Sequence, residues 1–184
     1  MRIIDLQPDA EDAIRQTAAM LVEGFAAHSP QAYPNMEAAL AEVQESFGEH
    51  RISRSAVEED GTVLGWIGAI SQYGGRVWEL HPLVVNIRHQ RKGRGRALVT
   101  DLEACVRARG GLTITLGTDD EDGQTSLSGI NLYPNVWEHI ARIKNLNAHP
   151  YEFYQKLGYV IVGVVPDANG IGKPDILMAK SIVQ

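Results

Sequence analysis

A short basic segment with two glycines is the part of this chain best suited to bind an anion. It consists of Gln90, Arg91, Lys92, Gly93, Arg94 and Gly95, and a stretch with helical periodicity follows it. The glycines let the backbone turn tightly and approach a ligand, and the helix start adds free N–H groups and a positive dipole end. The segment therefore predicts a pyrophosphate site, with a solvated basic turn as the alternative, because short glycine motifs are common.

The distribution of charge along the chain supports an anion site. The formal net charge is −6, yet residues 88–96 carry +5, which leaves −11 on the rest of the chain. Residues 119–122 add four consecutive acidic side chains. One compact basic segment in an acidic protein argues against a nucleic-acid partner, which usually needs positive charge spread over a face. We expect one anionic ligand and one cationic ligand.

Length and composition predict a single domain spanning residues 1–184. The chain has 184 residues, of which 44% are hydrophobic and 22% charged. No apolar stretch approaches the ~20 residues of a membrane span, so we expect no membrane partner. The single cysteine, Cys105, excludes an intramolecular disulfide and favours a reducing, cytoplasmic location. We expect Cys105 to be a core residue.

The elements that must position the basic segment follow from periodicity and turn signals. The predicted strands are 2–6, 51–59, 62–72, 77–85, 112–117, 159–165 and 176–182. The predicted helices start near Asp9, which we expect to cap the first, and near Asn35, then cover 94–109, 134–146 and 151–157. Many connections are hairpins, so the fold class is α+β with a mixed, mostly antiparallel sheet and helices on its faces. Pro82, inside 77–85, predicts a bulge because proline donates no ladder hydrogen bond.

Gln90, Gly93 and Gly95 between a strand and a helix resemble the acetyl-CoA signature Q/R-x-x-G-x-G/A of the GNAT superfamily of N-acetyltransferases, and the element order resembles that fold. Longer stretches resemble its aminoglycoside 6'-N-acetyltransferases. They are WELHPLVV (78–85), GGLTITLGTDD (110–120), NLNAHPYEFYQKLGY (145–159), IVGVVPDANG (161–170) and KPDILMAKSI (173–182). The resemblance implies acetyl transfer from acetyl-CoA to the 6'-amine of an aminoglycoside, resistance to that antibiotic, a pair of splayed strands and a homodimer.

The resemblance also implies roles for particular residues. The cofactor pyrophosphate would lie on Arg91–Arg96, and the pantetheine chain would pair with Leu83, Val84 and Val85. The Leu83 amide would polarise the thioester carbonyl, and Tyr154 would protonate the leaving thiolate. Direct attack by the amine needs no cysteine nucleophile.

Glu79 and His81 lie two apart on one strand and point to the same side, which the resemblance implies is the acceptor side of the thioester. We expect Glu79 to hold the amine while water or His81 removes its proton; His81 could instead be structural. Asp119 and Asp120 are candidates for ammonium recognition and, as a second possibility, for the base, with a solvated acidic loop as the alternative. Tyr73 is the best of three aromatic candidates for lining the pocket, ahead of Tyr33 and Phe25. Trp78 and Trp137 are expected in a core or an interface.

Two other functions stay open from the sequence. One is a GNAT enzyme for another polyamine or a peptide amine, which an acidic loop would also suit. The other is a non-catalytic acetyl-CoA sensor, which would not need Tyr154, Glu79 and His81. The six histidines and one cysteine show no zinc-ligand spacing, so no metal is expected.

Overall fold

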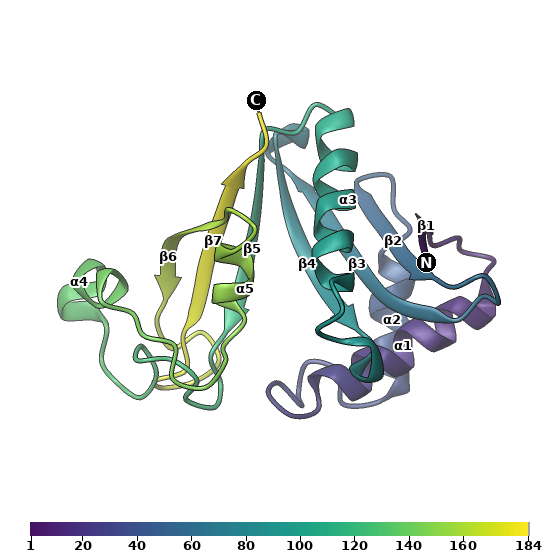
Figure 1. The fold of residues 1–184 in the computed structure, drawn as a ribbon. Helices are drawn as coiled ribbons and strands as arrows, with labels where there is room; N and C mark the ends of the chain where they lie inside the picture. The colour runs from purple at the N-terminus through teal and green to yellow at the C-terminus, as the bar shows by residue number, and fades with distance from the viewer. Residues whose placement is uncertain (184) are drawn as a thin grey trace. The chain divides into compact units, whose positions relative to one another are not determined.

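The computed structural model describes residues 1–183 and divides the chain into two compact units (Figure 1). The first unit is Met1–Ile114 with the last residues from Ile182, and the second is Thr115–Ser181. The expectation of one domain stays a prediction. Among the described residues, no helix is long and apolar enough to cross a bilayer.

An antiparallel sheet in the order β1-β2-β3-β4 forms the centre of the first unit. Its strands are β1 (Arg2–Asp5), β2 (Arg51–Val57), β3 (Val63–Gln72) and β4 (Val77–Val85). The hairpin predicted at Asp60 is confirmed: the Glu58 amide donates to the Thr62 carbonyl, and the Asp60 carboxylate accepts the Thr62 amide. Every residue from Val63 to Ala69 is buried, so both faces of β3 are covered.

Helices α1 (Glu11–Phe25), α2 (Met36–Glu45) and α3 (Arg94–Ala108) supply that cover. The α1 and α2 side chains share one apolar cluster with Trp66 of β3. The predicted cap of α2 is confirmed, since Asn35 Oδ1 accepts the Ala38 amide at 2.9 Å. The predicted Asp9 cap of α1 is wrong: Ala10 is the N-cap, and Asp9 contributes its backbone carbonyl to the Glu11 amide.

The bulge predicted at Pro82 is present where β3 meets β4. Ile67 pairs with Leu83 and Ala69 with Leu80, so two residues of β4 lie opposite Gly68. A Cβ atom on Gly68 would lie only 2.5 Å from the His81 carbonyl oxygen. The close backbone approach therefore requires glycine at this position, and the bulge shifts the side chains on either side of it.

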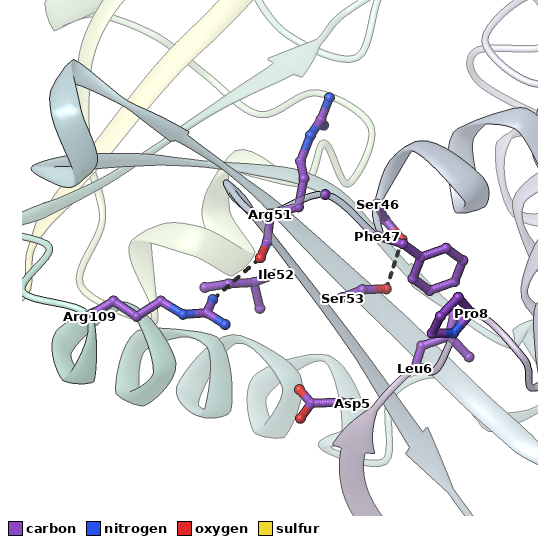
Figure 2. Close-up of a pocket in the computed structure, with 10 residues that line it drawn as sticks. Asp5, Leu6, Pro8, Ser46, Phe47, Arg51, Ile52, Ser53 and Arg109 are labelled. Carbon is purple, nitrogen blue, oxygen red and sulfur yellow. Dashed lines mark hydrogen bonds between the residues drawn. The ribbon is translucent and has the colours of Figure 1, made fainter.

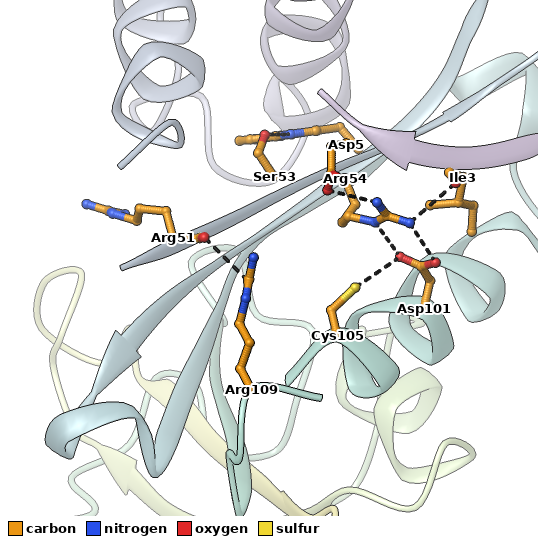
Figure 3. Close-up of polar contacts among 9 residues, drawn as sticks. Ile3, Asp5, Arg51, Ser53, Arg54, Asp101, Cys105 and Arg109 are labelled. Atoms are coloured by element: carbon orange, nitrogen blue, oxygen red, sulfur yellow. Dashed lines mark hydrogen bonds and ion pairs between the residues drawn. The ribbon is translucent and has the colours of Figure 1, made fainter. Parts of the chain in front are cut away.

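Cys105 lies on α3 and is only half-buried, which corrects the expectation that it is a core residue. It contacts Asp101, whose carboxylate binds the Arg54 guanidinium through two hydrogen bonds of 2.7 and 3.0 Å (Figure 3). Asp5 of β1 binds the same guanidinium at 2.8 Å. Burial and the nearby Asp101 carboxylate raise the pKa of the Cys105 thiol, so the reactive thiolate is disfavoured.

The second unit contains strands β5 (Thr113–Asp119, beginning at the end of the first unit), β6 (Val160–Val165) and β7 (Asp175–Ser181), in the order β5-β7-β6. Strands β6 and β7 pair in the antiparallel direction. Its short helices are α4 (Val136–Ala141) and α5 (Tyr151–Gln155), and a 3₁₀ turn covers Tyr133–Asn135. The first unit has two further 3₁₀ turns, Tyr73–Gly75 and Ile87–His89.

The helix expected over 134–146 stops at Ala141. The amides of Lys144, Leu146 and Asn147 bond to the segment 124–126, so these residues leave the helix. Trp137 on α4 is 69% exposed and is not a core residue, whereas Trp78 is buried as expected.

Candidate active site

The basic segment leads into α3, and no side chain caps the backbone amides at the start of this helix. Gly93 is the N-cap in a left-handed conformation, φ 78°, and no side chain caps this helix. Asn86 instead caps the preceding 3₁₀ turn through the Arg88 amide. The first amides of a helix have no partners within it, so those of Arg94, Gly95 and Arg96 are available to a ligand. This is the backbone arrangement of an anion site.

The polar side chains of the segment partly hold its own shape. Gln90 Nε2 donates to the Val85 carbonyl at 3.2 Å and ties the segment to the end of β4. Arg94 Nη1 donates to the His89 carbonyl at 3.3 Å, while Arg94 Nε is buried and has no hydrogen-bond partner in the structure. A buried guanidinium nitrogen without a partner is costly, and a phosphate oxygen would satisfy it. The residues present therefore fit a coenzyme pyrophosphate.

Downstream of the bulge, β4 continues into this segment. Leu83, Val84 and Val85 pair with Ile67, Trp66 and Gly65 of β3. Val84 is buried, and Leu83 and Val85 are half-buried. These three residues form the strand end that leads directly to the basic segment.

Glu79, upstream of the bulge, and His81, within it, have different partners. Gln72 Nε2 donates to Glu79 Oε2 at 2.6 Å. His81 Nε2 lies 3.7 Å from Glu42 Oε1, on α2. This carboxylate is the largest cause of a raised pKa of His81. Sequence reasoning assigned no role to Glu42, and only a helical position facing the sheet could have pointed to it.

The three aromatic candidates differ in exposure. Tyr73 is 75% exposed at the turn between β3 and β4. Tyr33 is buried, and its ring packs edge-to-face on Phe25 at 4.9 Å between centroids. Burial, with a smaller effect of Glu42, raises the pKa of the Tyr33 hydroxyl. Tyr73 is the most exposed of the three and can contact a ligand from solvent.

In the second unit, the two neighbouring aspartates have opposite surroundings. Asp119 is exposed at the end of β5, where its Oδ1 accepts a hydrogen bond from Asn169 Nδ2 at 2.5 Å. Asp120 is completely buried, and its two carboxylate oxygens each accept a backbone amide at 2.7 Å, from Gln124 and Thr125. The Asp120 side chain is thus committed to the loop that follows it.

His149 joins this strand end to helix α5. Its Nε2 lies 3.0 Å from the Asp119 carbonyl, and its Nδ1 accepts the Tyr151 amide. The ring is thus neutral with the proton on Nε2, and burial lowers the pKa of His149. Sequence reasoning missed this residue. The spacing of Asn145 and His149, which exchange two hydrogen bonds, was the available signal.

Tyr154 lies on α5 and is buried between aromatic rings. Phe153 and Tyr159 pack edge-to-face on it at centroid distances of 5.0 and 5.7 Å. Burial raises the pKa of the Tyr154 hydroxyl, so the phenol stays protonated near neutral pH.

A shallow pocket in the first unit lies away from the expected site residues. It encloses about 190 Å³ between β1, β2 and the end of α2 (Figure 2). Arg51 and Arg109 line it, and the hydrogen-bonded hydroxyls of Ser46 and Ser53 lie at its side. None of the expected site residues lines this pocket. Within residues 1–183, no group of three or more ligating side chains could hold a metal.

A family comparison agrees with this loop and strand geometry. Residues 19–133 match the acetyltransferase (GNAT) family. The chain is a GNAT acetyltransferase. This confirms the fold class expected from the element order.

Solved structures similar to this acetyltransferase cover its full length. A crystal structure of an aminoglycoside 6'-N-acetyltransferase complexed with coenzyme A is 44% identical, with a TM-score of 0.92, covering 100% of this chain and 98% of the other. The aminoglycoside 6'-N-acetyltransferase from Enterococcus faecium is 45% identical, with a TM-score of 0.89 and the same coverage. An aminoglycoside 6'-acetyltransferase type Ii is 38% identical over 100% and 99% of the chains, with a TM-score of 0.76. A comparison with curated proteins found no match.

Proposed function

We propose that this acetyltransferase moves the acetyl group of acetyl-CoA to the 6'-amine of aminoglycoside antibiotics and so confers resistance. The observation that carries the proposal is the full-length likeness, at 44% identity and a TM-score of 0.92, to an aminoglycoside 6'-N-acetyltransferase that binds coenzyme A. The unprotected start of α3 independently supports an anionic co-substrate.

The basic segment is proposed to hold the co-substrate, which supplies the acetyl group as a thioester. The amides of Arg91–Arg96 bind the pyrophosphate, and the buried Arg94 Nε gains a phosphate oxygen as its missing partner. Gln90 acts indirectly, by tying the segment to Val85. Lys92 and the arginines supply long-range attraction that salt weakens.

The acceptor is a polycation, and each carboxylate is assigned from its own surroundings. Glu79 is proposed to hold the reacting amine, with Gln72 fixing one of its oxygens. Asp119, exposed at the end of β5, is proposed to contact a second ammonium group. Asp120 supports that strand end through the loop amides it accepts and is not proposed to touch the substrate directly. Tyr73 is proposed to pack against a sugar ring.

The reaction must move protons as well as the acetyl group. The substrate ammonium first gives up a proton, and the neutral amine then forms a C–N bond to the acetyl carbon while the C–S bond breaks. The Leu83 amide is proposed to donate to the carbonyl oxygen as charge develops there. The Tyr154 hydroxyl is proposed to donate to the departing sulfur, and its raised pKa keeps that proton in place beforehand. The nitrogen loses its second proton on forming the amide, so one proton is released overall.

Thiol release with acetyl-CoA and kanamycin tests the proposal. We expect turnover with kanamycin and none with an aminoglycoside that carries a 6'-hydroxyl in place of the amine. Turnover with spermidine or a peptide and not with any 6'-amino aminoglycoside would replace this function with the acetylation of another amine. Acetyl-CoA binding without any turnover would indicate a sensor.

Tyr154→Phe tests the proposed acid. Loss of a general acid costs ~10²-fold or more in turnover, while the affinity for acetyl-CoA should change little. An unchanged kcat would remove Tyr154 from this role.

We also propose that the enzyme is cytoplasmic and forms a homodimer. The exposed apolar side chains Val160 and Val162 on the outer strand β6 support an association surface. Light scattering of the purified protein tests the dimer.

Resistance is tested by expressing the chain in a susceptible bacterium and measuring the inhibitory kanamycin concentration.

A further inference from the structure

Helix α2, whose role the sequence left open, brings a carboxylate to the histidine of β4. Glu42 Oε1 lies 3.7 Å from His81 Nε2. The Glu42 side chain is only 20% exposed, whereas the His81 side chain is 47% exposed. One end of the imidazole thus meets a sheltered carboxylate while the ring remains accessible from solvent.

Charged groups from three elements surround His81, and they do not contribute equally. Glu42 of α2 favours the protonated imidazole most, Glu79 of β4 favours it less, and Arg51 of β2 opposes it, as does burial. The sum raises the pKa of His81 above its ordinary value. A higher pKa makes the neutral imidazole a stronger base.

The position of Glu42 also favours one tautomer of the neutral His81 ring. A carboxylate beside Nε2 favours the proton on Nε2 in the neutral ring, which leaves the Nδ1 lone pair free. This is the arrangement in which an acidic residue orients a histidine base. Glu79 is not equivalent, because its carboxylate already accepts a hydrogen bond of 2.6 Å from Gln72.

We propose that Glu42 is a positioning residue that orients His81, and that His81 Nδ1 takes the proton from the substrate ammonium. The N–H bond of the ammonium breaks, the proton joins Nδ1, and Glu42 stabilises the resulting imidazolium. The freed amine lone pair then forms the C–N bond, and His81 later returns the proton to water. This inference rests on the proposed function, because it needs an ammonium acceptor.

The pairing is testable without turnover, by NMR titration of the His81 ring. Removing a neighbouring opposite charge typically lowers such a pKa by about one unit or more. We therefore expect Glu42→Gln to lower the pKa of His81 by about one unit, and Glu42→Asp to lower it less. Glu45→Gln, an exposed position on the same helix, is the matched control and should leave the pKa unchanged. The His81→Gln variant assigns the signal.

The role is tested by the pH dependence of kcat/KM with kanamycin. The base must be neutral to act, so activity falls as the pH drops through the pKa of His81. In Glu42→Gln the acidic limb should move to lower pH in parallel with the NMR value, and kcat at pH 7.5 should fall ~10-fold because the base is weaker and less well oriented. The KM for acetyl-CoA should not change. Thermal unfolding of each variant establishes that it is folded.

Three outcomes would overturn the inference. An unchanged pKa of His81 in Glu42→Gln would remove the pairing. A lowered pKa with an unmoved acidic limb would remove His81 as the proton acceptor. If the wild-type protein acetylates no aminoglycoside, the proposed function fails and the proton-acceptor role fails with it, whereas the NMR result still decides whether Glu42 and His81 are paired.

Discussion

Residues 88–96, which contain the basic segment, and residues 119–122, the acidic run, are both short runs of like charge in the sequence, but their surroundings in the structure differ. In the basic segment the backbone amides at the start of α3 have no capping side chain. In the acidic run Asp120 is fully buried and accepts two amides of its own loop. The basic segment therefore presents free backbone donors to a ligand. In the acidic run, one carboxylate already binds the backbone of its own loop. A run of like charges shows the sign of a partner but not which groups remain free for it.

The largest effect that would sharpen this comparison is expected from Asp120→Ala. The substitution removes the carboxylate and leaves two buried backbone amides without partners. Each hydrogen bond to a charged group contributes about 1.5–3 kcal/mol to the free energy of unfolding. We expect a lower midpoint of denaturant unfolding. Asp119→Ala is the matched control and should leave that midpoint nearly unchanged. Equal midpoints for the two variants would mean that Asp120 does not hold the loop.

The basic segment is tested by a pair of glycines at the two ends of α3. Gly93 and Gly110 have φ values of 78° and 77°, and neither has an atom within 4 Å of an added Cβ. Alanine in this conformation costs roughly 1–2 kcal/mol at either position. Only Gly93→Ala should also weaken acetyl-CoA binding, by roughly tenfold, since it alone reshapes the anion site. Calorimetric titration of both variants checks this, and an equal loss in Gly110→Ala would contradict it.

A pH-dependent effect is expected where the acidic run meets α5. Burial lowers the pKa of His149, so the unfolded chain binds a proton more readily than the folded one. This residue therefore reduces stability as the pH falls through its unfolded value of about 6.5. Unfolding free energies at pH 7.5 and 5.5 should show a smaller loss in His149→Gln than in the wild type. His81 has a raised pKa and therefore changes stability with pH in the opposite direction. Its effect is the same in the wild type and in His149→Gln, so the difference between their unfolding free energies isolates His149.

The smallest effect is expected from the exposed member of the acidic run. Asp119→Asn should raise the KM for kanamycin about 2–5-fold, as expected for one exposed ion pair, with kcat and stability unchanged. Asp122→Asn, at another exposed position of the run, serves as the comparison variant. No change in KM for Asp119→Asn would leave the acidic run without a direct contact to substrate.

Sequence reasoning was most successful where the decisive interactions are local. The Asn35 cap, the Asp60 hairpin and the Pro82 bulge each depend on residues a few positions apart or on proline's missing donor. It failed where distant segments compete for the same backbone. The helix expected over 134–146 ends at Ala141 because its later amides bond to residues 124–126. The resemblance of Gln90, Gly93 and Gly95, together with the element order, correctly identified the family, which the match over residues 19–133 confirms.

By itself, the sequence determined the order of elements, the bulge and the basic segment at the start of α3, because turn chemistry and periodicity act over a few residues. Only the tertiary structure decided which charged side chains are free. Glu42 and His81 are 39 positions apart by their numbering, and the fold brings them within 3.7 Å. Asp119 and Asp120 are adjacent, yet one is exposed and the other buried. Burial and pairing depend on which distant segments pack together, and adjacency in the chain does not encode that.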